Sequence, residues 1–235
     1  MGLSNTIRTL ANDFRIRASA CGVLMTNDRS GKAMGETAKT YCENWVKEEL
    51  YKRRKEFSSK YTEKGNKCEA SSIDYASEQF GWGLVAKNEQ HFTDEYMTGT
   101  PDIILADSVE DIKNSWDCFT FPLFDDDIPE KKYYWQGQVY MALTGKQTFG
   151  LVYTLMNAPD YLIEQEARRS ADWGEVEAEL YDAVRERMTY DELNSELRIK
   201  RFEIARNEED IERIRTRVQE AREYIRTLTT QAASV

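Results

Sequence analysis

Histidine is nearly absent from this chain of 235 residues, and its cysteines are few and scattered. A single histidine, His91, excludes chemistry that needs two of them, and its place beside Phe92 favours a structural role. The four cysteines are Cys21, Cys42, Cys68 and Cys118. They form no CxxC pair, which argues against a zinc site or an iron–sulfur cluster. Such lone thiols are typical of a reducing compartment, where most are small core residues.

Long apolar segments are also missing. No run approaches the roughly 18 residues of a membrane span, and residues 1–17 lack the apolar stretch of a signal peptide. Met1-Gly2 with Thr6 fits the bare myristoylation pattern, but so short a match arises often by chance. We therefore expect a cytoplasmic protein without a membrane partner.

The net charge of −10 looks wrong for a protein that binds nucleic acid, yet the charge is unevenly distributed. Residues 1–70 contain 14 basic and 9 acidic residues, whereas residues 71–235 contain 18 and 33. The run Lys52–Lys55 and three further lysines up to residue 67 form a basic patch suited to phosphates. An ordinary solvated helix face is an equally good interpretation of this run.

The spacing of apolar residues predicts helices and strands in alternation. Helices are expected at residues 35–57, 65–80, 130–145, 172–193 and 207–228, and strands at 96–105, 109–115, 147–156 and 197–204. The last strand alternates like an edge strand, and Asn207 opens the final helix like a cap. We expect one α/β domain over 1–235, with a core at about 15–155 and 197–228 and a helical insertion at 160–196.

Three charged residues lie on two central strands that are otherwise rich in core residues. Asp102 follows Gly-Thr-Pro, while Asp111 and Lys113 flank an isoleucine. Alternate residues of a strand share a face, so Asp111 and Lys113 point the same way, about 6–7 Å apart along the strand. Asp102 on the paired strand is expected to converge on them. A plain hairpin with surface charges is the alternative interpretation.

Two carboxylates brought together repel, and each is driven towards protonation unless a cation lies between them. A divalent ion removes this conflict, and oxygen ligands without His or Cys favour Mg²⁺ or Mn²⁺ over zinc. A lysine beside such an ion orients or deprotonates the attacking water, or steadies charge on a phosphate.

The segments TPDII (100–104) and DIKNS (111–115) resemble the PD-(D/E)xK nuclease superfamily. KGNKCEASSIDY (64–75) resembles the Gly-x-x-x-Glu helix of the branch that contains the phage lambda exonuclease and YqaJ-like viral recombinases, which implies that Glu69 approaches the metal. YWQGQVYMAL (134–143) resembles the Gln-x-x-x-Tyr signature of RecB-type nucleases, as Gln136 and Tyr140. We expect Gln136 near the site, Tyr140 packed against the hairpin, and the rival Gln138 facing elsewhere.

Both ends of the domain extend the resemblance. RIRASACGVLMT (15–26) resembles the N-terminal segment of this branch, which implies phosphate contacts for Ser19 and for Arg17 or Arg15. Arg53 and Arg54 of the basic run are expected to join them on the DNA-binding surface. LRIKRFEIARNEEDIERI (197–214) resembles the closing strand and helix.

The sequence departs from the family pattern in three places. Asp111 stands where glutamate is commoner, which the pattern permits. Glu110 should face away from the site, and we expect it at the surface. Segment 160–196 has no counterpart.

The resemblance implies a restriction-endonuclease-like core, a central mixed sheet flanked by helices, with a helical C-terminal extension. It also implies Mg²⁺-dependent hydrolysis of DNA, with Mn²⁺ as a substitute. Asp102 and Asp111, supported by Glu69, would hold one or two ions. Lys113 would position or activate the water, and Gln136 would orient the site.

The branch favours exonuclease action on duplex ends, in phage-type recombination or DNA processing, beside a single-strand annealing protein in a bacterial or phage-infected cell. A homo-oligomeric assembly is left open. Two alternatives remain: a structure-selective or restriction-like endonuclease, and a non-catalytic DNA-binding subunit of nuclease fold.

Overall fold

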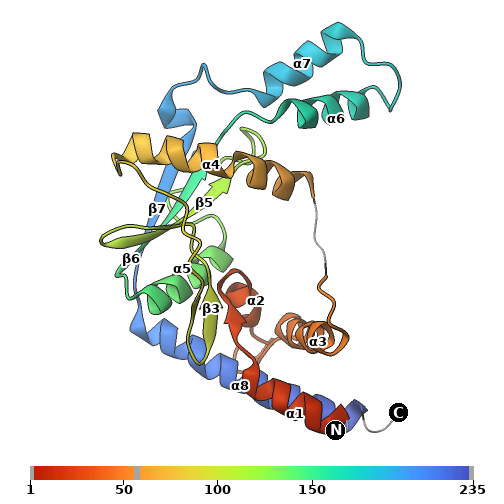
Figure 1. Cartoon of the computed structure of the whole chain (residues 1–235), viewed down its shortest axis with the longest axis vertical. Coiled ribbons are helices and arrows are strands. Elements are labelled where there is room, and N and C mark those ends of the chain that lie inside the picture. The colour runs from red at the N-terminus through yellow and green to blue at the C-terminus, as the bar shows by residue number, and fades with distance from the viewer. Residues whose placement is uncertain (1–2, 56–58, 233–235) are drawn as a thin grey trace.

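The computed structural model describes residues 3–55 and 59–232, with helices arranged around a central sheet (Figure 1). The α-helices are α1 (Leu3–Asp13), α2 (Cys21–Leu24), α3 (Glu36–Tyr51), α4 (Lys60–Phe80), α5 (Lys131–Thr144), α6 (Asp160–Ser170), α7 (Ala178–Met188) and α8 (Glu208–Ala232). The strands are β1 (Ile16–Arg17), β2 (Phe92–Thr93), β3 (Met97–Gly99), β4 (Ile103–Ile104), β5 (Ser108–Asn114), β6 (Thr148–Thr154) and β7 (Ile199–Ala205). Two short 3₁₀ helices lie at Ala18–Ala20 and Ser195–Leu197.

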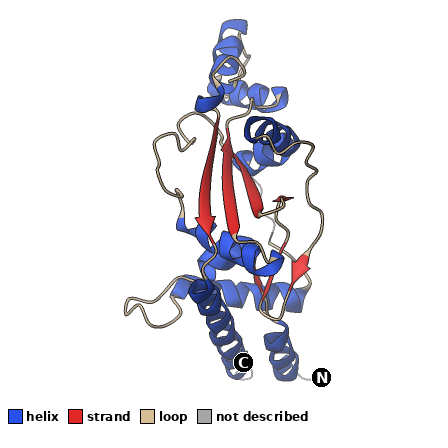
Figure 2. Cartoon of the chain, turned by 90° about the vertical axis from the view of Figure 1, so that its left-hand side faces the viewer, coloured by secondary structure: helices blue, strands red, loops and turns tan. Residues whose placement is uncertain are grey.

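Four strands form the central mixed sheet in the order β4-β5-β6-β7 (Figure 2). β5 pairs antiparallel with β4 and parallel with β6, which in turn pairs antiparallel with β7. A parallel pair cannot be closed by a tight turn, and α5 provides the crossover between β5 and β6. The edge position of β7 confirms the prediction from its alternating sequence.

Helices cover both faces of this sheet. On one face, Ile73 and Ala76 of α4 pack against Ile112 of β5 and Val152 of β6. On the other face, α5 approaches β6 closely at Gly137, where an added Cβ would come within 2.3 Å of the Phe149 ring. The absence of a side chain at Gly137 therefore sets how near α5 lies to the sheet.

The long helix α8 closes the lower part of the molecule. Its fully buried residues recur at helical spacing, and they are Ile211, Ile214, Val218, Ala221 and Ile225. This stripe belongs to the same core as Ile7 and Ala11 of α1, and α1 lies alongside α8 (Figure 1). Asn207 caps the helix by accepting a hydrogen bond from the Asp210 amide at 3.1 Å, as its sequence predicts.

Two smaller units complete the fold. β1, β3 and β2 form a second mixed sheet, in which β1 is parallel and β2 antiparallel to β3. At the top of Figure 1, α6 and α7 pack on each other through a separate cluster that includes Leu162, Ile163 and Val184.

The α/β class and the central mixed sheet flanked by helices are confirmed, whereas several expected boundaries were wrong. The strand expected at 96–105 divides into β3 and β4, which belong to different sheets, because Thr100–Asp102 leave one sheet before the chain joins the other. The helix expected at 35–57 ends at Tyr51, since Lys52 adopts a left-handed conformation; residues 56–57 lie outside the described part. The helix expected at 172–193 begins only at Ala178, after a turn with positive φ at Asp172 and Trp173.

Three of the cysteines are buried, as expected, and Cys118 is exposed. Within residues 3–55 and 59–232, no helix is both long and apolar enough to cross a membrane.

Candidate active site

Asp111 lies at the centre of the candidate site, in the middle of β5. Its side chain is 2% exposed, and its Oδ2 lies 2.5 Å from Lys113 Nζ, on the face that the strand alternation predicts. Asp111 Oδ2 is buried and has no hydrogen bond of regular geometry to any described residue. Among the described residues, the Lys113 ammonium is therefore the group that compensates this buried oxygen.

Asp102 joins the site from the segment just before β4. Its Oδ2 accepts a hydrogen bond of 2.7 Å from the Ile112 amide, which ties the carboxylate to the neighbouring strand. Burial, and after it the negative charge of Asp111, raise the pKa of Asp102 to about 7, although Lys113 and the Ile112 amide oppose the shift. Asp102 and Asp111 thus form a pair of acids that is not fully compensated by the protein.

Lys113 stays protonated in this environment. Burial alone lowers the pKa of a lysine, but the charges of Asp111 and Asp102 outweigh burial, so the pKa of Lys113 is raised. The ammonium also lies 5.6 Å from the centre of the Tyr133 ring, which favours its charged form.

Gln136 reaches the site from α5. Its Nε2 donates to Asp111 Oδ1 at 2.9 Å and lies 3.1 Å from the hydroxyl of Tyr140, one helical turn later. Tyr140 in turn donates to the Thr100 carbonyl at 3.3 Å and packs against Gly99. Gln138 lies elsewhere: its amide bonds the Ala205 carbonyl and the Asn207 amide, and it fixes the start of α8.

Glu69 lies apart from the two aspartates. It is on α4, and its Oε2 pairs with Lys87 Nζ at 2.5 Å. Its charge still contributes to the raised pKa of Asp102, so the two carboxylates influence each other. Among the described residues, no three acidic, histidine or cysteine side chains are grouped closely enough to hold a metal ion. The expected third carboxylate is therefore near the aspartate pair without joining it.

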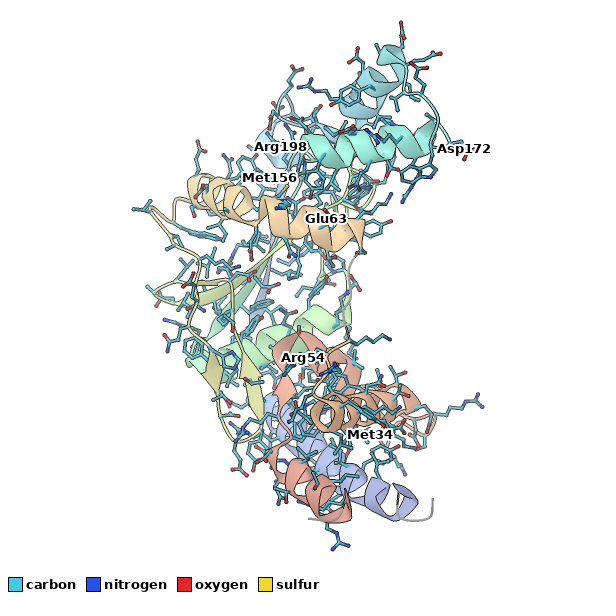
Figure 3. All side chains as sticks on the ribbon, turned by 45° about the vertical axis from the view of Figure 1, so that its right-hand side comes forward. Met34, Arg54, Glu63, Met156, Asp172 and Arg198 are labelled. Atoms are coloured by element: carbon cyan, nitrogen blue, oxygen red, sulfur yellow. The ribbon has the colours of Figure 1, made fainter. Side chains whose placement is uncertain are left out.

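A groove of about 700 Å³ runs beside the site, between the small sheet and the end of α3. Its lining includes four basic residues and the segment that leads to Asp102; the basic residues are Arg15, Arg17, Lys52 and Arg54. Ser19 lines the same groove and is exposed, whereas Arg53 does not line it. In Figure 3, Arg54 lies below Glu63 of α4.

Glu110 corrects the expectation of a surface residue. It does face away from Asp111, but it is fully buried, because Arg201 of β7 reaches across the sheet to it. The two Glu110 oxygens accept bonds of 2.8 and 2.9 Å from Arg201. An added Cβ at Gly150, on the strand between them, would come within 1.8 Å of Glu110. The Glu110–Arg201 ion pair spans three strands, so the sequence of the β4–β5 hairpin alone could not predict it.

Two further residues near the site were missed. Lys64 of α4 is completely buried, and its ammonium donates to the carbonyls of Ser115 and Trp116 at 2.9 Å each, directly after β5. Asn88 bonds the backbone of Pro101 and Asp102. A helix lysine with apolar neighbours at three- and four-residue spacing is a weak sign of such burial. His91, expected to be structural, contacts the hydroxyls of Thr98 and Thr100.

Comparison with known proteins finds the same fold in exonucleases. The crystal structure of a phage-related exonuclease from Haemophilus somnus 129PT superposes with a TM-score of 0.76 at 26% identity, covering 95% of this chain and 99% of that one. The alkaline exonuclease from Laribacter hongkongensis gives 0.63 at 17% identity, and its complex with dAMP 0.62 at 19%, each covering 98% of both chains. No protein-family description and no curated protein matches the sequence.

The chain therefore has the fold of phage-related and alkaline exonucleases over nearly its whole length.

Proposed function

We propose that this chain is a metal-dependent DNA exonuclease of the PD-(D/E)xK type, which hydrolyses phosphodiester bonds at duplex ends. The observation that carries the proposal is the convergence of Asp102, Asp111 and Lys113 in a fold shared with exonucleases. Gln136 supports it, because its amide holds Asp111 from a second element. Fold alone would not identify an activity, so the arrangement of these side chains is essential to the argument.

The donor set fits Mg²⁺ or Mn²⁺. Asp111 Oδ2 is buried beside the Lys113 ammonium at 2.5 Å, and burial and the charge of Asp111 raise the pKa of Asp102, so one ammonium faces two buried carboxylates and a further cation would stabilise the pair. The pair offers carboxylate oxygens, which are the ligands that hard divalent ions prefer. Asp102 and Asp111 would hold the ion, with Glu69 available as a third ligand once it leaves Lys87.

A bound divalent ion supplies charge that polarises a phosphate and lowers the pKa of water. The residues of the chain provide the rest. In the metal-free site Lys113 is charged, and it would position the water or steady negative charge on the phosphate. Gln136 fixes the orientation of Asp111 through one oxygen, and Tyr140 lies beside its amide.

The groove beside the site offers a place for the DNA backbone. Arg17, Ser19 and Arg54 line it, and its wall includes Thr100, two residues before Asp102. Phosphates bound here by basic side chains would approach the two aspartates. The solved complex of the Laribacter exonuclease with dAMP is consistent with nucleotide binding in proteins of this fold. Action beside a single-strand annealing protein in phage-type recombination would extend this proposal.

The test is a digestion of linear duplex DNA and of closed circular DNA by the purified chain, with Mg²⁺ and with EDTA. We expect loss of the linear substrate in Mg²⁺, an intact circle, and no reaction in EDTA. Cleavage of the circle would instead identify an endonuclease. Binding of both substrates without cleavage would identify a DNA-binding subunit, and digestion in EDTA would contradict the metal site.

A further inference from the structure

The loop between α4 and β2, residues 81–91, is fastened to the segment that carries Asp102. The Asn88 amide donates to the Asp102 carbonyl at 2.7 Å, and its side chain donates to the Pro101 carbonyl at 2.9 Å. The Asn88 side-chain oxygen also accepts a bond from the Gln90 amide at 3.1 Å. Asn88 thereby fixes the loop at a defined distance from the candidate site.

Lys87 precedes this anchor and points to the acids. Its Nζ lies 2.5 Å from Glu69 Oε2, and this hydrogen bond raises the pKa of Lys87, with smaller contributions from the charges of Glu69 and Asp102. The side chain of Lys87 is 50% exposed and that of Glu69 is 29% exposed, so the pair lies open to solvent at the edge of the site. A half-exposed ion pair of this kind is weak enough to exchange.

We propose that Lys87 is a positioning residue that occupies Glu69 in the metal-free site and yields this carboxylate to an incoming divalent cation. The inference rests on the proposed function, because it assigns Glu69 as a ligand of the same site. One carboxylate cannot serve the ammonium and the ion equally, so each weakens the binding of the other. This competition explains why Glu69 stands beside the aspartate pair without joining it.

The test is a calorimetric titration of Mn²⁺ into the full-length protein without DNA. Lys87→Met keeps an unbranched apolar stem and removes the ammonium. We expect it to bind Mn²⁺ about two- to fivefold more tightly than the wild type. This ratio is the free energy of a half-exposed ion pair expressed as a change in affinity. Thermal unfolding of each variant checks that the fold is retained.

Lys67→Met is the matched control. Lys67 is an exposed lysine of α4, two residues from Glu69, with no ion pair to any residue that the structure describes. Its Mn²⁺ affinity should equal that of the wild type. In the Glu69→Gln background, Lys87→Met should leave the affinity unchanged, because the contested carboxylate is gone.

The outcomes separate this inference from the proposed function. A wild-type protein that binds no Mn²⁺ contradicts the metal site itself. A wild type that binds Mn²⁺ while Lys87→Met shows no gain overturns only the competition. Equal gains for Lys67→Met and Lys87→Met, or a gain that persists in the Glu69→Gln background, would reduce the effect to general charge and also overturn it.

Discussion

Asp102 gives the metal-free protein a defined pH dependence. Its pKa is about 7 in the folded chain and near 3.8 in the unfolded chain. Between these values the folded state binds more protons than the unfolded state, so stability falls as pH rises through the window. Above about pH 7 both states are ionised, and this contribution becomes constant.

Asp102→Asn should remove that penalty. Asparagine keeps an oxygen for the Ile112 amide but carries no charge next to Asp111. In EDTA we expect the melting temperature of the variant to exceed that of the wild type by an amount that grows from pH 5 to pH 8, by a few degrees for each kcal/mol of burial cost and repulsion that the substitution removes.

Mn²⁺ should stabilise the wild type and not the Asp102→Asn variant. It should raise the melting temperature of the wild type by mass action and leave Asp102→Asn nearly unchanged, since the variant lacks one of the two principal ligands. Thermal scans at pH 5, 6, 7 and 8, with EDTA or Mn²⁺, measure both effects. A difference between the proteins that does not depend on pH would contradict the raised pKa of Asp102.

Lys113 should matter for turnover, and because it is also the cation beside the buried Asp111, the stability of its variant is measured in parallel. Lys113→Ala is expected to lower the rate of DNA cleavage at least about 10²-fold, the typical loss for one positioned electrostatic group. Duplex affinity measured in Ca²⁺ should remain close to that of the wild type. Lys131→Ala, on the exposed start of α5, is the control. Near wild-type cleavage by Lys113→Ala would refute a role in the reaction.

For single residues, the sequence predicted correctly those positions that depend on the alternation of side chains along one strand. The period of two along β5 predicts that Asp111 and Lys113 share a face, and the structure has their charged groups 2.5 Å apart. The burial of Glu110 could not be predicted in this way, because its partner Arg201 follows 91 residues later on another strand. Glu69 was placed on the right helix, but its pairing with Lys87 depends on how the next loop is anchored.

Among the secondary-structure elements, β5, β6 and β7 are joined by the Glu110–Arg201 pair as well as by their backbones. Arg201→Met would leave a fully buried carboxylate without its cation. We expect a loss of about 3–5 kcal/mol in the free energy of unfolding, typical of a broken buried pair.

Urea unfolding measures this loss, and two comparisons sharpen it. Glu203→Gln removes the exposed second partner of Arg201 and should cost no more than about 1 kcal/mol. The double variant Glu110→Leu with Arg201→Met should recover part of the loss, since no buried charge remains at this pair. Equal stability of Arg201→Met and the wild type would show that the pair contributes nothing.

Element boundaries were harder to predict than element types. The segment 96–105 has apolar residues at both ends, separated by Thr98–Asp102, and its two halves form β3 and β4, which pair with different strands. Periodicity reports which side of a strand is apolar and does not report its partner. The end of α3 similarly depends on the left-handed conformation of Lys52. Lysine rarely adopts this conformation, so the sequence does not predict it.

For the whole molecule, charge distribution provides the test of the DNA-binding surface. Lys52–Lys55 follow α3 and do not continue it as a helix face, and Arg54 lines the groove that leads towards Asp102. We expect the reversal Arg53→Glu with Arg54→Glu to weaken duplex binding. It should also lower the slope of log affinity against log salt by about 0.9 for each phosphate that the variant no longer neutralises.

The control must lie on α8 without supporting the fold. Arg215 is suitable, because it is 35% exposed and its ion pair is with Glu212 on the same helix. Arg217 on the same helix is not suitable, since its buried guanidinium donates to the Leu24 and Thr26 carbonyls. Affinities are measured in Ca²⁺ over a range of salt. Equal slopes for the wild type and the Arg53/Arg54 variant would exclude this surface from DNA binding.

Gly137 has a consequence for how such a chain changes over generations. It bears no functional group, yet it lets α5 lie close to the Phe149 ring, and Gln136 contacts Asp111 from that helix. Any side chain at position 137 must displace that ring or the helix, and with it the neighbouring amide. If cleavage is under selection, substitutions at Gly137 should be as rare as substitutions of Asp102 and Asp111. A substitution that does persist at position 137 should be accompanied by a smaller residue at position 149.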